Sequence, residues 1–404
     1  MLYTKDSEKV CKFIIKNMNN LHNIKLTGLS SKILLTFYND ILNYNNLVEK
    51  QFQNYNIKFI EKIDKPSLYE SKFVSNGILS EIEDAVGVLE CNVRINDLDV
   101  SIKVLMFNKN TNSFTKAKNI IKKTIIYLNF IQQYSEKTGT LKIYLYLTKL
   151  KKKLPENNRE ILGSNNVNTA VTYACAKNGE IYIYRFEEWY KVLMHEIMHS
   201  LCLDFSPVHS QGTINLKNKI KNLFKINTKN DIAEAYTEFW ANILNLSFIS
   251  FYSLKGNINR KSFLEYFESH LNIERAYSLF QMNKILHFLD IEDYEHLYEN
   301  NKVSKNIRRF YKEDSNIFSY YFLKSIFLYN TNLFIKWNWE NNINIIKFNK
   351  HNNNNYNKLY NFIEQKYKNK KFLEEIKEMK KVLKKSNTPF IKDNLRMTVF
   401  SLLI

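Results

Sequence analysis

The sequence predicts an α+β fold in which a small mixed sheet is flanked by mainly helical regions. Between residues 92 and 184 several apolar residues alternate with polar neighbours, which is typical of strands. On both sides of this stretch apolar residues recur at helical spacing. The 404 residues include only 8 Gly and 4 Pro, which leaves little material for long linkers. We therefore expect four regions: a mainly helical region 1–89, an α+β unit 90–203, a helical region 204–289 and a helical region 290–404.

The first region is expected to be helical, and it carries no motif with recognisable chemistry. Its expected helices span residues 10–18, 32–47 and 79–88. The sheet begins after it, where residues 93–95 and 100–104 alternate apolar and polar side chains around Asn96-Asp97. Because Asn and Asp favour tight turns, this pattern predicts a β-hairpin.

The α+β unit continues with a helix, a strand and a second hairpin. Isoleucine and leucine recur at helical spacing over 113–134, where we expect a helix. Alternation over 141–147 predicts a strand. Two extended runs, 167–175 and 180–184, flank Asn178-Gly179, and Asn-Gly between such runs predicts a hairpin.

The chain beyond residue 204 is expected to be almost wholly helical. The Asn-rich stretch 341–357 predicts a surface loop, and 372–385 has the pattern of a solvated amphipathic helix. The longer expected helices span residues 231–254, 261–289, 315–334 and 356–385.

The charge of the chain is strongly positive, with 59 Lys and Arg against 40 Asp and Glu and a formal net charge of +19. Such a charge attracts polyanions without specificity. The basic residues are dispersed, and no recognised nucleic-acid-binding motif is present. Lys, Asn, Ile and Tyr are abundant while Ala, Gly and Pro are scarce, the bias of an AT-rich coding sequence. We therefore expect nucleic acid to bind, if at all, only through non-specific basic charge.

The sequence predicts no membrane span, because its apolar stretches are too short to cross a bilayer. Residues 1–9 carry mixed charge where a signal peptide would have an apolar core. The four cysteines form no C-x-x-C pair, so we expect buried free thiols in a reducing compartment and a cytoplasmic protein. Any metal must then be bound by His and carboxylates.

One short motif carries chemistry: His195, Glu196 and His199 form H-E-x-x-H in an apolar run that favours a helix over 187–203. Residues four apart project from one helix face, so both imidazoles can bind one zinc ion at about 2.0–2.1 Å. Glu196 is rotated by about 100° from His195, so its carboxylate can reach a water on the ion without being a ligand. The alternative is a core helix face, but burying these groups without partners would be costly. We interpret the motif as a metal site suited to hydrolysis.

A third protein ligand is needed, and the sequence offers several candidates. Asp204 and His209 lie shortly after the motif, although neither has the spacing of an extended three-histidine motif. Glu234 and Glu238 lie four apart on the helix expected from residue 231, and either can supply a carboxylate. Asp231 and Glu234 also have the spacing of a capping box, so Glu234 can instead tie off the helix start.

At these residues the sequence resembles the gluzincin zinc metallopeptidases, the zincin group of thermolysin and neprilysin. In that family a later helix carries E-x-x-x-D, whose Glu completes the metal site while its Asp hydrogen-bonds the first His of H-E-x-x-H. The resemblance implies that Glu234 is the third zinc ligand and that Glu238 orients His195. This chain has Glu at the position where the family has Asp. The resemblance covers residues 163–245.

The same resemblance gives roles to neighbouring segments. It makes 90–203 the upper lobe of a zincin-like catalytic unit and 204–289 the lower lobe with the third-ligand helix. In zincins an edge strand before the motif helix pairs with an extended peptide substrate. Here that strand would include Asn168, Thr169 and Ala170, which are the implied substrate contacts. An ordinary hairpin would show the same sequence pattern.

The implied activity is hydrolysis of a peptide or protein substrate, with one Zn²⁺ per chain and Glu196 as general base. Residues 187–199 and the composition also resemble uncharacterised zinc peptidases of large DNA viruses, which would place a viral protein in the host cytoplasm or the virion. Two alternatives stay open: a basic scaffold protein with an inactive zincin fold, and a basic nucleic-acid-binding protein. The sequence does not distinguish endo- from exopeptidase action. It also identifies neither the oxyanion-stabilising residue among 26 tyrosines nor the oligomeric state.

Overall fold

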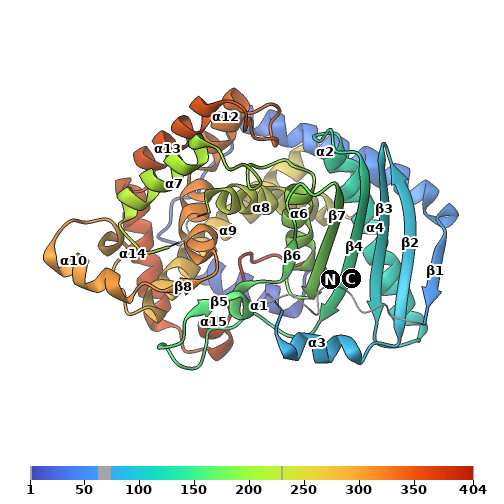
Figure 1. The fold of residues 1–404 in the computed structure, drawn as a ribbon, viewed down its shortest axis with the longest axis horizontal. Coiled ribbons are helices and arrows are strands. Elements are labelled where there is room, and N and C mark those ends of the chain that lie inside the picture. Colours follow the sequence, from blue (N-terminus) through green and yellow to red (C-terminus); the bar gives the residue numbers. More distant parts are fainter. Residues whose placement is uncertain (1, 62–73, 229–230, 404) are drawn as a thin grey trace.

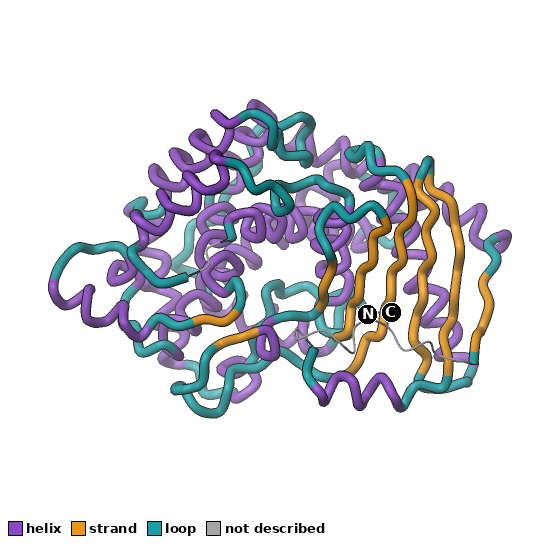
Figure 2. The backbone as a smooth tube through the Cα atoms, viewed as in Figure 1, coloured by secondary structure: helices purple, strands orange, loops and turns teal. Residues whose placement is uncertain are grey.

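The computed structural model describes residues 2–61, 74–228 and 231–403. A mixed six-stranded sheet stands at one side of the molecule, and a larger helical body fills the other side (Figures 1 and 2). The chain is therefore α+β, as the sequence predicts. The main hydrophobic cluster draws residues from all four predicted regions, so the sheet and the helical body share one core.

The sheet has the strand order β1-β2-β3-β4-β7-β6. Its centre is parallel, because β3 pairs with β4 and β4 with β7 in the same direction, while β1, β2 and β6 run antiparallel to their neighbours. Strand β6 is the last strand in this order and is therefore an edge strand. The strands of the sheet are β1 (Ile57–Ile60), β2 (Gly87–Ile95), β3 (Leu98–Met106), β4 (Gly139–Thr148), β6 (Ala170–Thr172) and β7 (Asn178–Arg185). A separate pair is formed by β5 (Leu162–Gly163) and β8 (Glu313–Asp314).

Helices cover both faces of the sheet. Helix α4 (Thr111–Gln132) lies against β2 and β3, and α2 (Gly28–Gln51) packs behind it. On the opposite face, α3 (Asn76–Glu83) packs on a smaller apolar cluster that includes tyrosines of β4 and β7. The predicted hairpin at Asn96-Asp97 is confirmed, since β2 pairs with β3 around it and Asn96 has the left-handed φ of 52° that Asn tolerates.

The helical body is built around α6 (Trp189–Ser200), every residue of which is buried. Helix α8 (Ile232–Ser253) packs on α6, and α9 (Arg260–Phe288) packs on α8. The other helices are α1 (Lys5–Asn17), α5 (Ser164–Val167), α7 (Gln211–Phe224), α10 (Lys302–Ile307), α11 (Lys324–Tyr329), α12 (Thr331–Asn341), α13 (Asn353–Lys366), α14 (Lys370–Lys385) and α15 (Pro389–Asp393). Short 3₁₀ turns are η1 (Phe52–Asn54), η3 (Tyr294–Leu297) and η4 (Arg308–Phe310), and η5 (Phe318–Leu323) is a π-helix.

The C-terminal segment 394–402 is buried, and side chains from several helices hold its backbone. The carboxylate of Glu188 accepts a hydrogen bond from the N–H of Met397 at 2.7 Å, and that of Glu274 accepts one from the N–H of Val399 at 3.0 Å. These bonds satisfy buried backbone donors that the segment does not pair within itself. The two chain ends meet on the same side of the molecule (Figure 1).

Three of the expected helices differ from the structure, and the sheet begins earlier than expected, because β1 (Ile57–Ile60) already belongs to it. The helix expected over 79–88 ends at Glu83, because β2 begins at Gly87 and pairs with both β1 and β3. The helices expected over 315–334 and 356–385 are each divided, the first after Tyr329 and the second after Lys366. Asn330 and Asn369 stand at these breaks, and Asn favours helix ends over helix interiors.

The second predicted hairpin is correct in its pairing and wrong in its turn. Strands β6 and β7 pair antiparallel, but β6 covers only 170–172 and the connection is 173–177. Gly179 lies inside β7, where a Cβ would stand 2.6 Å from Oγ of Ser200. The glycine therefore allows β7 to approach the end of α6 closely and does not form a turn.

Candidate metal centre

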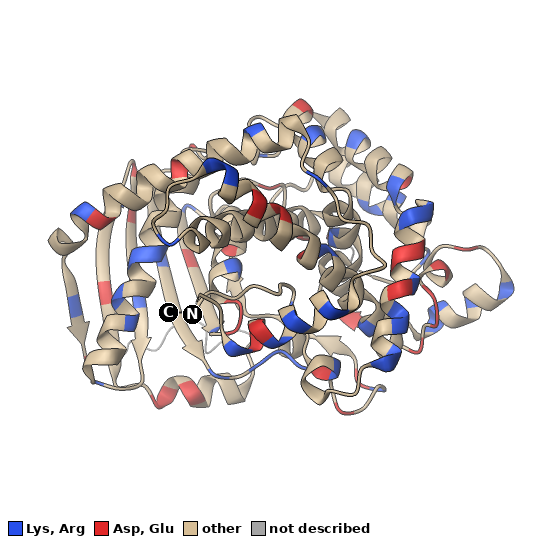
Figure 3. Ribbon diagram, turned by 180° about the vertical axis from the view of Figure 1, so that it is seen from behind, with Lys and Arg blue, Asp and Glu red and all other residues tan. Residues whose placement is uncertain are grey.

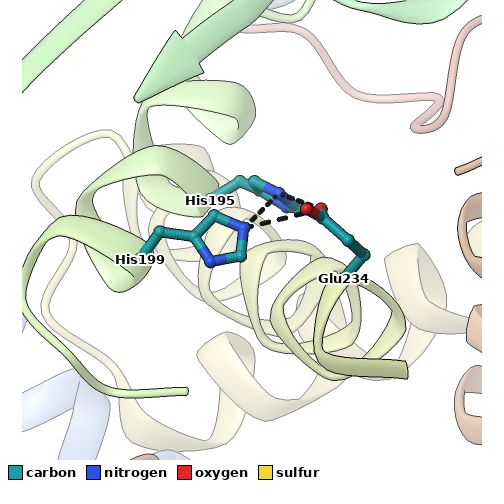
Figure 4. A group of neighbouring side chains, drawn as sticks. All are labelled: His195, His199 and Glu234. Atoms are coloured by element: carbon teal, nitrogen blue, oxygen red, sulfur yellow. Dashed lines mark hydrogen bonds and ion pairs between the residues drawn. The ribbon is translucent and has the colours of Figure 1, made fainter. Parts of the chain in front are cut away.

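The two histidines of the motif lie one turn apart on α6 and point toward the first turn of α8 (Figure 4). Nε2 of His195 lies 2.9 Å from Nε2 of His199. Glu234 approaches both imidazoles from α8, with its Oε2 3.1 Å from Nε2 of His195 and 3.5 Å from Nε2 of His199. All three side chains are buried or nearly so. The structure thus brings Glu234 to two histidines that precede it by 35 and 39 positions in the sequence.

The capping alternative for Glu234 is not what the structure shows. Asp231 is the N-cap of α8, and its carboxylate accepts from the N–H of Ala233 at 3.2 Å. The carboxylate of Glu234 instead contacts the two histidines and accepts a hydrogen bond from the hydroxyl of Tyr320 at 3.1 Å. Glu234 therefore does not cap α8, and its carboxylate is available to a metal ion between α6 and α8.

The three facing atoms have the spacing of a tetrahedral zinc site. Ligand atoms about 2.0–2.1 Å from a tetrahedral zinc ion are about 3.3 Å from one another. The observed separations between the three atoms are 2.9, 3.1 and 3.5 Å. Among the described residues, His195, His199 and Glu234 form the group of donors that can share one metal ion. The donor set, two imidazoles and one carboxylate, is the set that catalytic zinc takes.

Carboxylates hold the outer nitrogen of each imidazole. Nδ1 of His195 lies 3.0 Å from Oε2 of Glu238, and Nδ1 of His199 lies 2.7 Å from Oδ2 of Asp204. When each Nδ1 donates its proton to the carboxylate beside it, both Nε2 atoms present lone pairs toward Glu234. Three acceptors then face one point, where a positive charge, either a proton or a metal ion, relieves their mutual repulsion.

Glu238 lies beside Nδ1 of His195, the position at which the resemblance implies an orienting carboxylate. Lys191, one turn before His195 on α6, forms a buried ion pair with Glu238. Burial alone would raise the pKa of Glu238, but the charges of Lys191 and His195 outweigh this effect and hold the pKa far below its usual range. Glu238 is therefore a fixed anion, and its position between Lys191 and His195 accommodates the longer side chain.

Electrostatics favour charged forms throughout the cluster. Burial would lower the pKa of His199, but Asp204 and Glu234 outweigh this and raise the pKa well above its usual value. Burial would raise the pKa of Glu234, and the two histidines lower it well below its usual range. The cluster thus attracts positive charge from both sides of the Nε2 atoms.

Asp204 and His209 are not ligands in this geometry. Among the described residues, the donors that can share an ion include neither of them. Asp204 is completely buried behind His199, where Ser206 and Thr237 also reach its carboxylate. His209 is an exposed loop residue. Asp204 therefore holds the outer nitrogen of a candidate ligand, His199, and sequence spacing did not reveal this contact because Asp204 lies in the irregular segment after α6.

We expect Asp204→Asn to weaken zinc binding by about 10–100-fold, the usual effect of removing a carboxylate behind a metal-bound histidine. The side chain of Asn keeps the size but loses the charge that orients His199. Zinc affinity measured by competition with a chromophoric chelator checks this expectation. His209→Ala is the matched control and should leave affinity unchanged; an equal loss in both variants would contradict the assignment.

Glu196 faces the cleft beside the three ligands. It is 9% exposed, and burial raises the pKa of its carboxyl. The cleft has a volume of ≈ 630 Å³ and runs between β6 on one side and α7, α8 and η5 on the other. Its wall includes His195, Glu196, His199, Glu234, Ala170, Thr172 and Tyr320. Tyr320 comes from the π-helix η5, and no feature of the sequence distinguished it from the other tyrosines.

The implied substrate contacts lie at this cleft, but only one of them is in the edge strand. Asn168 and Ala170 line the cleft, and Thr169 joins them around a smaller cavity behind His195. The carbonyl of Thr169 accepts from the N–H of Tyr184 at 3.0 Å. By the alternation of an antiparallel pair, Ala170 and Thr172 then turn their backbone groups away from β7.

The cysteine expectation is wrong for one pair. Cys175 and Cys202 form a disulfide, with Cα atoms 4.8 Å apart, while Cys11 and Cys91 are free. The two residues are 27 positions apart, and the connection after β6 folds onto the end of α6 to bring them together. The N–H of Cys175 also donates to the carbonyl of His199 at 3.0 Å. The disulfide does not fit the expected reducing compartment.

Comparison with known proteins identifies no relative: no family model, no curated protein and no solved structure matches this chain. Across the part of the chain that the structure describes, no helix combines the length and apolar character needed to cross a membrane. Figure 3 shows Lys and Arg spread over the helices and the sheet with Asp and Glu among them. The functional argument therefore depends on the residues and geometry of the centre itself.

Proposed function

We propose that this chain is a zinc-dependent metallopeptidase of the zincin type that hydrolyses peptide bonds. The observation that carries the proposal is the meeting of His195, His199 and Glu234, with mutual separations of 2.9–3.5 Å, beside the carboxylate of Glu196. A zinc ion held by these three ligands would act as a Lewis acid on a substrate carbonyl and would lower the pKa of a water molecule.

Glu196 is the group we assign as general base. It lies next to His195 on α6 and lines the same cleft, but it is not in the ligand group. Its carboxylate can accept a proton from an attacking water and deliver that proton to the leaving amine. Because the carboxylate of Glu196 is buried, little bulk solvent competes for it, which strengthens its interaction with the attacking water and with the leaving amine.

Tyr320 is the donor we assign to the developing oxyanion. Its hydroxyl donates to Glu234, its ring lies 6.2 Å from that of His195, and it lines the cleft. Burial raises the pKa of Tyr320 well above its usual value, so the hydroxyl stays protonated. Because the hydroxyl has one proton, it would turn from Glu234 to the reacting carbonyl, where a donor stabilises the negative charge that forms.

The edge strand β6 is the segment we assign to substrate binding. Ala170 and Thr172 direct backbone groups away from β7 and line the cleft. An extended peptide can add to such an edge through main-chain hydrogen bonds, which places a peptide bond near Glu196. Asn168 and Thr169 precede the strand and form the end of this surface.

Metal removal tests the function. Incubation of the full chain with a mixed peptide library should give cleavage products, detected by mass spectrometry. Dialysis against 1,10-phenanthroline should abolish cleavage, and one equivalent of zinc should restore it, because the three ligands then regain the Lewis acid.

Two outcomes would replace the proposal by the alternatives. A fully zinc-loaded chain that cleaves no peptide in the library would be the inactive scaffold. A chain without cleavage that binds DNA or RNA with steep salt dependence would be a nucleic-acid-binding protein. The dispersed charges in Figure 3 give no specific support to the second alternative.

A further inference from the structure

A second cavity lies away from the metal centre and is lined by residues from the end of α9, from α14 and from α15. Its volume is ≈ 750 Å³, within the range of about 300–1,000 Å³ that small-molecule sites occupy. Apolar side chains form much of its wall: Leu154, Phe288, Ile291 and Leu383. None of the residues assigned to the metal centre lines this cavity.

One wall of the cavity carries a buried lysine. Lys284, near the end of α9, is 2% exposed, and its Nζ donates to the carbonyl of Asn394 at 2.6 Å. Phe280 lies 5.2 Å from the same Nζ. No carboxylate among the described residues forms an ion pair with this amine; Asp393 is the acidic residue whose charge acts on it. Burial lowers the pKa of Lys284 well below its usual range.

The other buried lysines show what Lys284 lacks. Lys152 forms an ion pair with Glu188, and Lys191 forms one with Glu238. Lys324, like Lys284, forms no ion pair among the described residues, and burial lowers its pKa, but the charges of three buried carboxylates, Glu238, Glu274 and Glu188, partly oppose that effect. A lysine is almost never fully buried without such a partner, because the ammonium loses its hydration. A carboxylate delivered into the cavity would supply the missing partner of Lys284.

The remaining charges at this cavity belong to its exposed rim. Lys380 pairs with Asp293 at 2.7 Å, and Asp290 accepts from the side chain of Asn158 at 3.0 Å. The other charged or titratable rim residues are His287, Glu292, Lys384, Lys392 and Asp393. Among the residues that line the cavity, Lys284 is therefore the one buried titratable group, and it lies beside the buried apolar side chains of Phe288, Ile291 and Leu383.

We propose that this cavity is a binding site for an amphipathic organic carboxylate, whose carboxylate pairs with Lys284 while its apolar body packs on Phe288, Ile291 and Leu383. The apolar wall gives affinity in proportion to the area it removes from water. The ion pair gives selectivity for an anion over a neutral molecule of the same shape, because a hydrogen bond between charged groups is stronger than one between neutral groups.

Titration calorimetry on the full chain tests the site with octanoate as the probe. We expect one octanoate to bind per chain, octanamide to bind at least about tenfold more weakly, and acetate to give no measurable binding. The comparison of octanoate with octanamide tests the contribution of the carboxylate charge. The comparison of octanoate with acetate tests the contribution of the apolar wall. Both use the unmodified protein, so they hold even if a variant at position 284 fails to fold.

Two variants locate the binding. Lys284→Met should weaken octanoate binding by at least about tenfold, whereas Lys385→Met, at an exposed lysine of α14 that does not line the cavity, should change it by less than about threefold. Absence of octanoate binding, equal binding of octanamide, or unchanged binding in a folded Lys284→Met chain would each overturn the proposal. Zinc binding and peptide cleavage are separate readouts, so failure here leaves the metal centre untouched.

Discussion

Replacing Glu196 with Gln is expected to reduce peptide hydrolysis by about 10²–10⁴-fold while one zinc stays bound per chain. Gln has nearly the same size but cannot accept the proton of an attacking water. Because Glu196 is outside the ligand group, the three metal contacts are retained. The two quantities to measure are kcat on a cleaved peptide and zinc content by elemental mass spectrometry.

The matched control is Glu180→Gln, which changes a carboxylate on β7 that pairs with Lys142 and does not line the cleft. It should keep normal turnover and normal zinc content. Retained turnover in Glu196→Gln would reject Glu196 as the base. Loss of zinc in that variant would instead show that Glu196 supports the metal.

Replacing Glu234 with Ala is expected to empty the site and abolish cleavage. The side chain supplies the third ligand atom, so its loss should cost more affinity than the about 10–100-fold loss caused by removing a supporting carboxylate. Zinc content after dialysis against a zinc-buffered chelator measures the effect. Because Glu234 is partly exposed and Asp231 still caps α8, we expect the variant to fold.

The variant Glu238→Gln distinguishes Glu234 from Glu238 as the third zinc ligand. If Glu238 only orients His195, this variant should retain zinc with affinity lowered by about 10–100-fold. Full zinc occupancy in Glu234→Ala, combined with an empty site in Glu238→Gln, would move the third ligand to Glu238. The distances to His195 place Glu234 at its Nε2 and Glu238 at its Nδ1, which favours the first outcome.

The sequence alone predicts those residues of the centre that are related by helical spacing. His195 and His199 share a helix face by periodicity, and the resemblance adds Glu234 and Glu238 on a second helix. Asp204 and Tyr320 were not predicted in their roles, because one lies in an irregular segment and the other reaches the cleft only through tertiary packing. Such residues carry no periodic signal that a single sequence displays.

The fold shows the same division between local and long-range information. Strand alternation and helical spacing place β4, α4, α8 and α9 within a few residues of their observed bounds. The Cys175–Cys202 disulfide and the close approach of Gly179 to Ser200 depend on the connection after β6 folding onto α6. Contacts of that kind are set by the assembled structure, so the sequence expectations of free thiols at Cys175 and Cys202 and of an Asn-Gly turn were wrong.

Anomalous diffraction at the zinc edge, from crystals of the zinc-loaded chain, tests the central claim most directly. The account predicts a single strong peak about 2.0–2.2 Å from Nε2 of His195, Nε2 of His199 and a carboxylate oxygen of Glu234. A zinc peak bound elsewhere, with those three side chains turned away from one another, would contradict it.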